Sequence, residues 1–176
     1  GDKILYSSTE AAGEACPPKP DRSLGYVWPL DAYDIYVANP DGSDKRLLMG
    51  GPGYDAEATM AFDGSRIVFT SSRDGDLELY TANIDGSRVA RITNAPGYDG
   101  GAFFSPDSTK LVWRAARPAG AELDEYRALL AQKLVKPGRL EIWVGGADGQ
   151  NARAITNNGR ANFAPSFLPD SRRVIF

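Results

Sequence analysis

Three oxygen-bearing side chains have the types and the spacing that could support chemistry, namely Asp55, Asp99 and Asn162. Each stands at the same position of an internal repeat, just before a segment expected to form a strand. Carboxylate and amide oxygens are the ligands that Ca²⁺ prefers, so these residues, helped by Glu57, could hold a calcium ion. Alternatively, each side chain caps its own turn by accepting backbone N–H groups. We favour the turn interpretation, because oxygen ligands without tight sequence spacing are weak evidence for a metal.

The composition argues against catalysis within this chain. None of the 176 residues is histidine, which removes the commonest general base and rules out Ser-His-Asp and Cys-His sites. The single cysteine, Cys16, can form neither an intrachain disulfide nor a structural zinc site by itself. No pair of acidic residues stands out as the two carboxylates of a glycosidase. We therefore expect no enzymatic activity, no catalytic residue and no cofactor beyond the calcium ion considered above.

Charge and hydropathy limit the partners. The 20 basic and 23 acidic residues are interspersed and give a net charge of −3, so there is no basic stripe for nucleic acid. The longest apolar runs are strand-sized, such as residues 67–69, far below the roughly 18 residues of a membrane span. The sequence begins with Gly1 and has no signal-peptide pattern, so we expect a processed or truncated N-terminus.

An internal repeat must position the candidate residues. Residues 35–43 recur as residues 79–87, at an offset of 44 and with six of nine residues identical. A third copy, at residues 142–150, lies 63 residues further on, which is the same period plus an insertion of 19. A second motif, at residues 62–69, returns twice with the same two spacings. Self-similarity at such a period indicates a repeat architecture.

Each period predicts four short strands joined by turns. In the clearest copy the strands are expected over residues 56–61, 66–71, 77–82 and 89–93, with Asp-Gly turns between them. Four strands in about 44 residues is the pattern of a β-propeller blade. We predict an all-β fold of four-stranded antiparallel sheets in one domain over residues 1–176, with about three complete blades plus one strand and one short helical insertion. The repeated aspartates are expected to be structural turn residues: Asp41, Asp63, Asp85, Asp107, Asp148 and Asp170.

Five short motifs carry a resemblance to a known family. They are Ser105-Pro106-Asp107, Ser72-Arg73-Asp74-Gly75, Leu79-Tyr80, Asp85-Gly86 and Ile92-Thr93. Together they resemble the PD40 (WD40-like) repeats of TolB-like β-propellers, with Ser108 and Ser171 in place of the usual turn glycine. The resemblance implies a six-bladed ring, of which this chain would form about half, completed by further sequence or another subunit. It also implies a protein-interaction role in the bacterial envelope and a periplasmic or exported location.

Two insertions fall between the second and third strands of a blade, at residues 10–33 and 117–139. Propeller geometry puts both on the same face. The first is rich in proline and aromatic residues, which either present a binding surface or pack among themselves. The second predicts a helix over residues 122–134 with one apolar stripe. This stripe packs on the propeller itself or, alternatively, in a partner's groove.

The elaborated face is the predicted binding surface for a protein partner. Its candidate residues are Tyr26, Trp28, Tyr33, Tyr54, Asp55, Tyr98, Asp99, Tyr126 and Asn162. Two other functions stay open at this point. The chain could be an accessory structural subunit of a larger, membrane-associated complex. It could also be the propeller domain of a prolyl-oligopeptidase-like serine peptidase, whose hydrolase domain would lie outside this chain.

Overall fold

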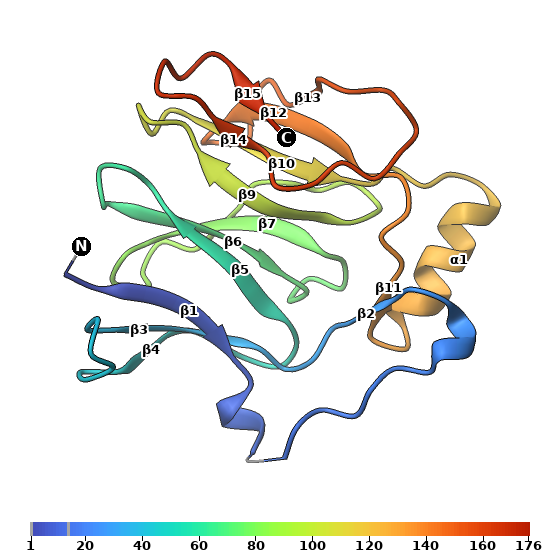
Figure 1. The fold of residues 1–176 in the computed structure, drawn as a ribbon, viewed down its shortest axis with the longest axis horizontal. Coiled ribbons are helices and arrows are strands. Elements are labelled where there is room, and N and C mark those ends of the chain that lie inside the picture. Colours follow the sequence, from blue (N-terminus) through green and yellow to red (C-terminus); the bar gives the residue numbers. More distant parts are fainter. Residues whose placement is uncertain (1, 14) are drawn as a thin grey trace.

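The repeated strands form antiparallel sheets that lie one beside the next, as Figure 1 shows. A computed structural model describes residues 2–13 and 15–176. One complete blade contains β5 (Asp55–Met60), β6 (Arg66–Ser71), β7 (Glu78–Asn83) and β8 (Ala90–Arg91). The next contains β9 (Asp99–Phe104), β10 (Lys110–Ala115), β12 (Glu141–Gly146) and β13 (Arg153–Ala154). The predicted four-stranded antiparallel blade is therefore confirmed.

Parts of two further blades flank these sheets. On one side lie β1 (Ile4–Ser8), β3 (Asp34–Ala38) and β4 (Arg46–Met49), which correspond to the second, third and fourth strands of a blade. On the other side lie β14 (Ser166–Phe167) and β15 (Val174–Ile175), which correspond to the first and second strands. Within the described residues the sheets form an open part of a ring, so the predicted blades are distributed as two complete and two partial sheets.

The core lies between the blades, because both faces of each sheet are apolar. Along β6, Ile67 and Phe69 face the sheet of β1, β3 and β4, whereas Val68 faces the following blade. All three side chains are fully buried. Strands that are covered on both faces read as continuous apolar runs, which explains the composition of this strand. Since each blade completes the core of its neighbour, no blade buries its apolar surface alone.

Each innermost strand, or the segment that leads into it, carries one residue in the left-handed region of backbone conformation. The residues are Glu57, Gly101 and Ala164, with φ of 56°, 59° and 49°, and they occupy equivalent positions of the repeat. In β5 and β9 this residue accompanies a shift in the pairing register, as in a β-bulge. The bulge is therefore a feature of the repeat, and glycine satisfies it in only one of the three copies.

The turn between the first and second strands links neighbouring blades. Ser108 and Ser171 adopt positive φ values of 57° and 55°, where the family pattern has glycine. The Ser108 hydroxyl accepts the backbone N–H of Asp63 in the preceding blade at 3.3 Å, and Ser171 accepts that of Asp107 at 3.1 Å. The serines thus provide a contact that glycine would lack. Each of the six turn aspartates accepts a backbone N–H two residues ahead, in Asp41, Asp63, Asp85, Asp107, Asp148 and Asp170.

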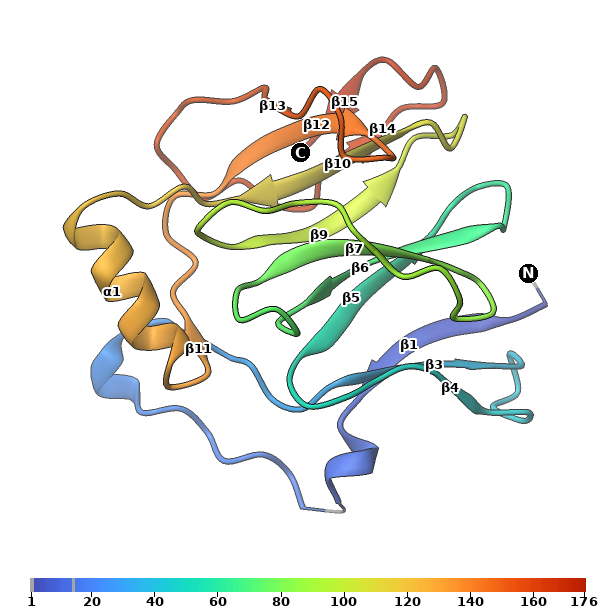
Figure 2. The ribbon, with the colours of Figure 1, turned by 180° about the vertical axis from the view of Figure 1, so that it is seen from behind.

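The two insertions meet at one end of the blades. β2 (Trp28–Pro29), from the first insertion, pairs antiparallel with β11 (Leu134–Val135), from the second. The first insertion also contains two short 3-10 helices, Glu10–Ala12 and Arg22–Leu24. Both views of the chain place helix α1 (Ala121–Leu130) beside this pair of strands, away from the turns that join the first and second strands (Figure 1 and Figure 2).

Helix α1 is shorter than the apolar stripe predicts. It ends at Leu130, and the prediction of helix up to residue 134 is wrong because Leu134 pairs with Pro29 in β11. Tyr126 and Leu129 are buried. Leu123 and Leu130 pack against the apolar cluster that contains Tyr126, so the stripe packs on its own chain. At ten residues α1 is far too short to cross a bilayer, and no other described helix has the length or apolarity of a membrane span.

The Ser108 turn yields a stability prediction. Replacing Ser108 by alanine keeps the strained φ and removes the hydroxyl that accepts the Asp63 N–H, which should cost about 1 kcal/mol of unfolding free energy. Replacing it by glycine removes the same hydroxyl but relieves about 1 kcal/mol of left-handed strain, so this variant should stay close to wild type. Urea unfolding of both variants checks the order. Equal losses would contradict the role of the backbone conformation.

Candidate functional site

The two predicted aspartate ligands are each engaged by an arginine of their own blade. Arg73 donates to Asp55 Oδ1 at 2.9 Å. One period later, both terminal nitrogens of Arg117 donate to the Asp99 carboxylate at 2.8 Å. Trp113 Nε1 donates to Asp99 Oδ1 at 2.7 Å. Aspartate and arginine are 18 residues apart in both copies, a recurrence visible in the sequence that the sequence analysis missed.

Asn162, the third predicted ligand, is also engaged within the protein. Its Nδ2 donates to the Leu140 carbonyl at 2.8 Å and to Asn158 Oδ1 at 3.1 Å, and its Oδ1 accepts from Asn158 Nδ2 at 2.9 Å. Among residues 2–13 and 15–176, no group of three or more His, Cys, Asp or Glu side chains could hold a metal ion. Asp55, Asp99 and Asn162 therefore do not form one calcium site. Each lies at a separate junction between two neighbouring blades.

These junctions join consecutive blades through the backbone. The N–H of Asp55 donates to the Tyr33 carbonyl at 3.0 Å, in the loop before the third strand of the preceding sheet. Asp99 bonds to Leu77 in the same way at 2.9 Å, and Asn162 bonds to Leu140 at 3.0 Å. The three residues occupy the same position of the repeat, and each makes the same backbone hydrogen bond to the preceding blade. Their spacing therefore follows the period of the blades and does not indicate a shared ligand.

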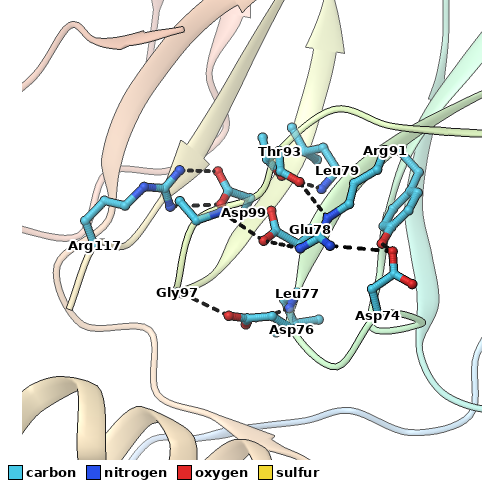
Figure 3. A network of polar contacts seen from close by, with 12 residues as sticks. Asp74, Asp76, Leu77, Glu78, Leu79, Arg91, Thr93, Gly97, Asp99 and Arg117 are labelled. Atoms are coloured by element: carbon cyan, nitrogen blue, oxygen red, sulfur yellow. Dashed lines mark hydrogen bonds and ion pairs between the residues drawn. The ribbon is translucent and has the colours of Figure 1, made fainter. Parts of the chain in front are cut away.

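An acidic side chain at the start of each third strand completes the junction. Asp34, Glu78 and Glu141 stand at equivalent positions, and each accepts backbone N–H groups from the loop that leads to the next blade. Glu78 also binds Arg91 at 2.9 Å, as Figure 3 shows. Its second oxygen is buried without a hydrogen-bond partner among the described residues. Burial raises the pKa of Asp99 to about 7, and the nearby Glu78 charge adds to the rise, whereas Arg117 opposes it.

Much of the predicted binding face lies inside the protein. Five of its nine residues are at most 9% exposed, namely Asp55, Tyr98, Asp99, Tyr126 and Asn162, whereas their role in binding a partner stays a prediction. The half-buried aromatic residues pack against one another, with Tyr33 and Tyr54 5.9 Å apart and Trp28 5.9 Å from Tyr98. Tyr26 alone among the nine is widely exposed, at 73%.

A charged cluster that the sequence analysis missed anchors the first insertion. Arg114 pairs with Glu57, the residue with left-handed φ, and the Tyr98 hydroxyl donates to Glu57 Oε2 at 2.8 Å. The Arg114 guanidinium lies 5.3 Å from the Trp28 ring centre and 5.6 Å from that of Phe163. Burial raises the pKa of Tyr98 well above its ordinary value, so this hydroxyl stays protonated. The cluster holds the insertion to the inner strands by cation–π contacts.

A pocket of about 780 Å³ opens between α1 and the second complete blade. One wall comes from the second insertion, with Glu122, Glu125, Tyr126, Leu129, Lys136 and Arg139. The facing wall comes from the blade and from the first residues after β10, with Arg117, Pro118, Glu141, Trp143, Ala154 and Thr156. This volume lies in the range of ligand pockets, roughly 300–1,000 Å³. Of the predicted site residues, only Tyr126 lines it.

The architecture defines a β-propeller fold, and solved structures share it. A putative TolB from Agrobacterium tumefaciens has 24% identity and a TM-score of 0.57, over 71% of this chain and 41% of that protein. TolB from Acinetobacter baumannii has 18% identity and a TM-score of 0.61, over 83% and 32%. Kuenenia stuttgartiensis hydrazine synthase has 14% identity and a TM-score of 0.66, over 97% and 27%.

These likenesses support the TolB-like interpretation at the level of fold alone. No protein-family model and no curated protein matches the sequence, so membership of the PD40 family stays a prediction. The match covers less than half the length of each of these three proteins. The activities and partners of these proteins can therefore be assigned to this chain only as proposals.

The raised pKa of Asp99 predicts a pH dependence of stability. Between the ordinary value of 3.8 and the folded value of about 7, the native carboxyl binds a proton that the unfolded chain does not. Its contribution to stability therefore decreases as pH rises through this window. Asp99→Asn should remove this slope, and asparagine already stands at the equivalent position, Asn162. Urea midpoints between pH 5 and pH 8 measure it.

Asp41→Asn is the matched control. A turn hydrogen bond from Ser43 lowers the pKa of Asp41, so this group stays ionised above pH 5 in both states. The control should therefore keep the wild-type slope. Identical slopes for wild type and Asp99→Asn would contradict the assignment of the pH dependence to Asp99.

Proposed function

We propose that this chain is a non-catalytic protein-interaction module, with a partner bound on the face built by the two insertions. The observation that carries the proposal is the pairing of β2 with β11, which joins segments about 100 residues apart into one body at one end of the blades. Surface loops held on a rigid scaffold commonly carry binding functions. Tyr26, exposed on this body, and the pocket beside α1 give the partner a contact and a recess.

The non-catalytic part of the proposal rests on the side-chain inventory. The sequence has no histidine, and the acidic residues at the blade junctions are engaged by arginines or backbone N–H groups. Such pairing stabilises a fold but leaves no free base beside a nucleophile. An exported location in the bacterial envelope, with no nucleic-acid partner, belongs to the same proposal and rests on the resemblance of the repeats to TolB-like proteins.

Site-specific cross-linking tests where the partner binds. A photo-reactive benzoylphenylalanine replaces Tyr26 in one variant and Phe62 in another, and both variants are irradiated in the cells that make the protein. The two positions are 73% and 70% exposed, and Phe62 lies in the turn after β5, away from the insertions. We expect a discrete protein adduct, at least fivefold more abundant, from position 26. Equal yields, or no adduct at either position, would contradict the proposed face.

A second candidate function is that of an accessory structural subunit in a larger complex. It is favoured by the sheet of β1, β3 and β4, which within the described residues has three strands where its neighbour has four. Among the described residues β1 pairs on one side only, with β3, and an edge of this kind presents N–H and C=O groups with which a strand of another subunit can pair. Masses of the natively purified protein, measured under native and then denaturing conditions, test this. A stoichiometric second polypeptide would support it, whereas a single chain type would contradict it.

A further inference from the structure

The first complete blade holds a paired cation at the outer edge of its sheet, beside the buried Glu78. Arg91 donates to Glu78 at 2.9 Å and lies 3.6 Å from the Asp74 carboxylate. Its Nε donates to the Thr93 carbonyl at 2.8 Å. Arg91 stands across from Tyr80 in the pairing of β7 and β8, and the Tyr80 hydroxyl donates to Asp74 at 2.6 Å. Figure 3 shows this network, in which one guanidinium satisfies several acceptors.

The second complete blade keeps the acid but lacks the cation. Across from Trp143, the counterpart of Tyr80, the pairing of β12 and β13 places Ala154 where Arg91 stands in the first blade. Pro118, which follows Arg117, replaces Asp74, which follows Arg73. Glu141 and Thr156 keep the positions of Glu78 and Thr93. The two complete blades can therefore be compared directly. The second has alanine and proline where the first has arginine and aspartate.

Glu141 is consequently a charged group without a cationic partner. Its carboxylate accepts from the Thr156 hydroxyl and from the Gly159 N–H at 2.9 Å. Although desolvation acts in the opposite direction, these hydrogen bonds hold the pKa of Glu141 below its ordinary value, so it is ionised at neutral pH. No basic side chain in the described parts of the chain forms a salt bridge with it.

The vacated place lies in the pocket beside α1. Pro118, Glu141, Trp143 and Ala154 all line it. Three lining cations are already paired, namely Arg117 with Asp99, Lys136 with Glu125 and Arg139 with Glu122. Glu141 is then the remaining uncompensated charge, so the pocket favours a positive group. Trp143 Nε1 is buried without an acceptor among the described residues, whereas the Tyr80 hydroxyl in the first blade has Asp74.

We propose that this pocket binds an arginine side chain of the protein partner, whose guanidinium takes the place beside Glu141 that Arg91 takes beside Glu78. The inference rests on the proposed interaction function and names the group recognised. A guanidinium fits better than an ammonium, because Arg91 uses its planar set of donors toward a carboxylate and a carbonyl at once. The volume of about 780 Å³ leaves room for the residues that flank the arginine in a peptide.

The test compares two small probes that differ in charge. Nα-acetyl-arginine N-methylamide is titrated into the protein, and the neutral isostere Nα-acetyl-citrulline N-methylamide is the matched probe. The three tryptophans give three indole N–H signals in NMR spectra, and Trp143→Phe assigns the one in the pocket. We expect a saturable shift of this signal with the arginine probe and at least tenfold weaker binding of the citrulline probe. Glu141→Gln should weaken the arginine probe by a similar factor.

A gain-of-contact variant provides an independent readout. Ala154→Arg should rebuild the pair of the first blade, fill the pocket from within, raise the melting temperature and abolish probe binding. Ala90→Arg adds the same charge to an exposed position of β8 and should leave binding unchanged. This variant pair keeps the proposal testable if Glu141→Gln fails to fold.

The outcomes separate this inference from the function on which it rests. Equal responses to both probes, no shift, or binding unchanged by Ala154→Arg would overturn the arginine site, while cross-linking from position 26 could still support the interaction module. Arginine-probe binding that depends on Glu141, without any protein adduct from position 26, would retain the guanidinium site but overturn the protein partner. Loss of binding in Ala154→Arg together with a position-26 adduct would support both.

Discussion

The rest of the structure depends on one backbone hydrogen bond that recurs at every described blade junction. A residue at the start of an inner strand, such as Asp99, or in the segment before it, as for Asn162, donates its N–H to the carbonyl just before the third strand of the preceding blade, such as that of Leu77. Because both faces of each sheet are apolar, the blades must stack, and stacking alone would allow them to slide. This hydrogen bond sets the relative height of neighbouring blades. The polar side chains at the same positions make additional hydrogen bonds, to Arg73, to Arg117 and to the Leu140 carbonyl.

The residues that donate this hydrogen bond include aspartates, whose charged side chains lie in the interior and therefore require partners. Asp99 is fully buried, and Arg117 approaches it from the loop that follows β10. Removing such a partner would leave an uncompensated buried charge, which is far more costly than the pair is stabilising. The arginines that follow the second strands are thus part of the junction. The loops beyond them are free to lengthen, and the second insertion begins at this point.

The pocket arises where the repeat is broken rather than where it is kept. In the first complete blade Arg91 forms a salt bridge with Glu78, so the charge of this carboxylate is neutralised within the blade. In the second, the change to Ala154 leaves Glu141 facing a recess that α1 has walled on its other side. A repeat protein can acquire a binding site in this way without altering its scaffold, because each blade contacts only its neighbours. The proposed recognition of arginine follows from what the unbroken copy contains.

The sequence by itself determined the period, the four-stranded blade and the aspartate turns, because these depend on contacts between residues close in the chain. An Asx turn such as that of Asp63 needs only Ser65, and the strand over residues 66–71 reads directly from its apolar run. Only the tertiary structure decided that Asp55, Asp99 and Asn162 form blade junctions, that α1 ends early because β11 pairs with β2, and that Glu141 lacks a cation. Each of these outcomes depends on which side chain a distant segment brings near, and a local pattern does not contain that information.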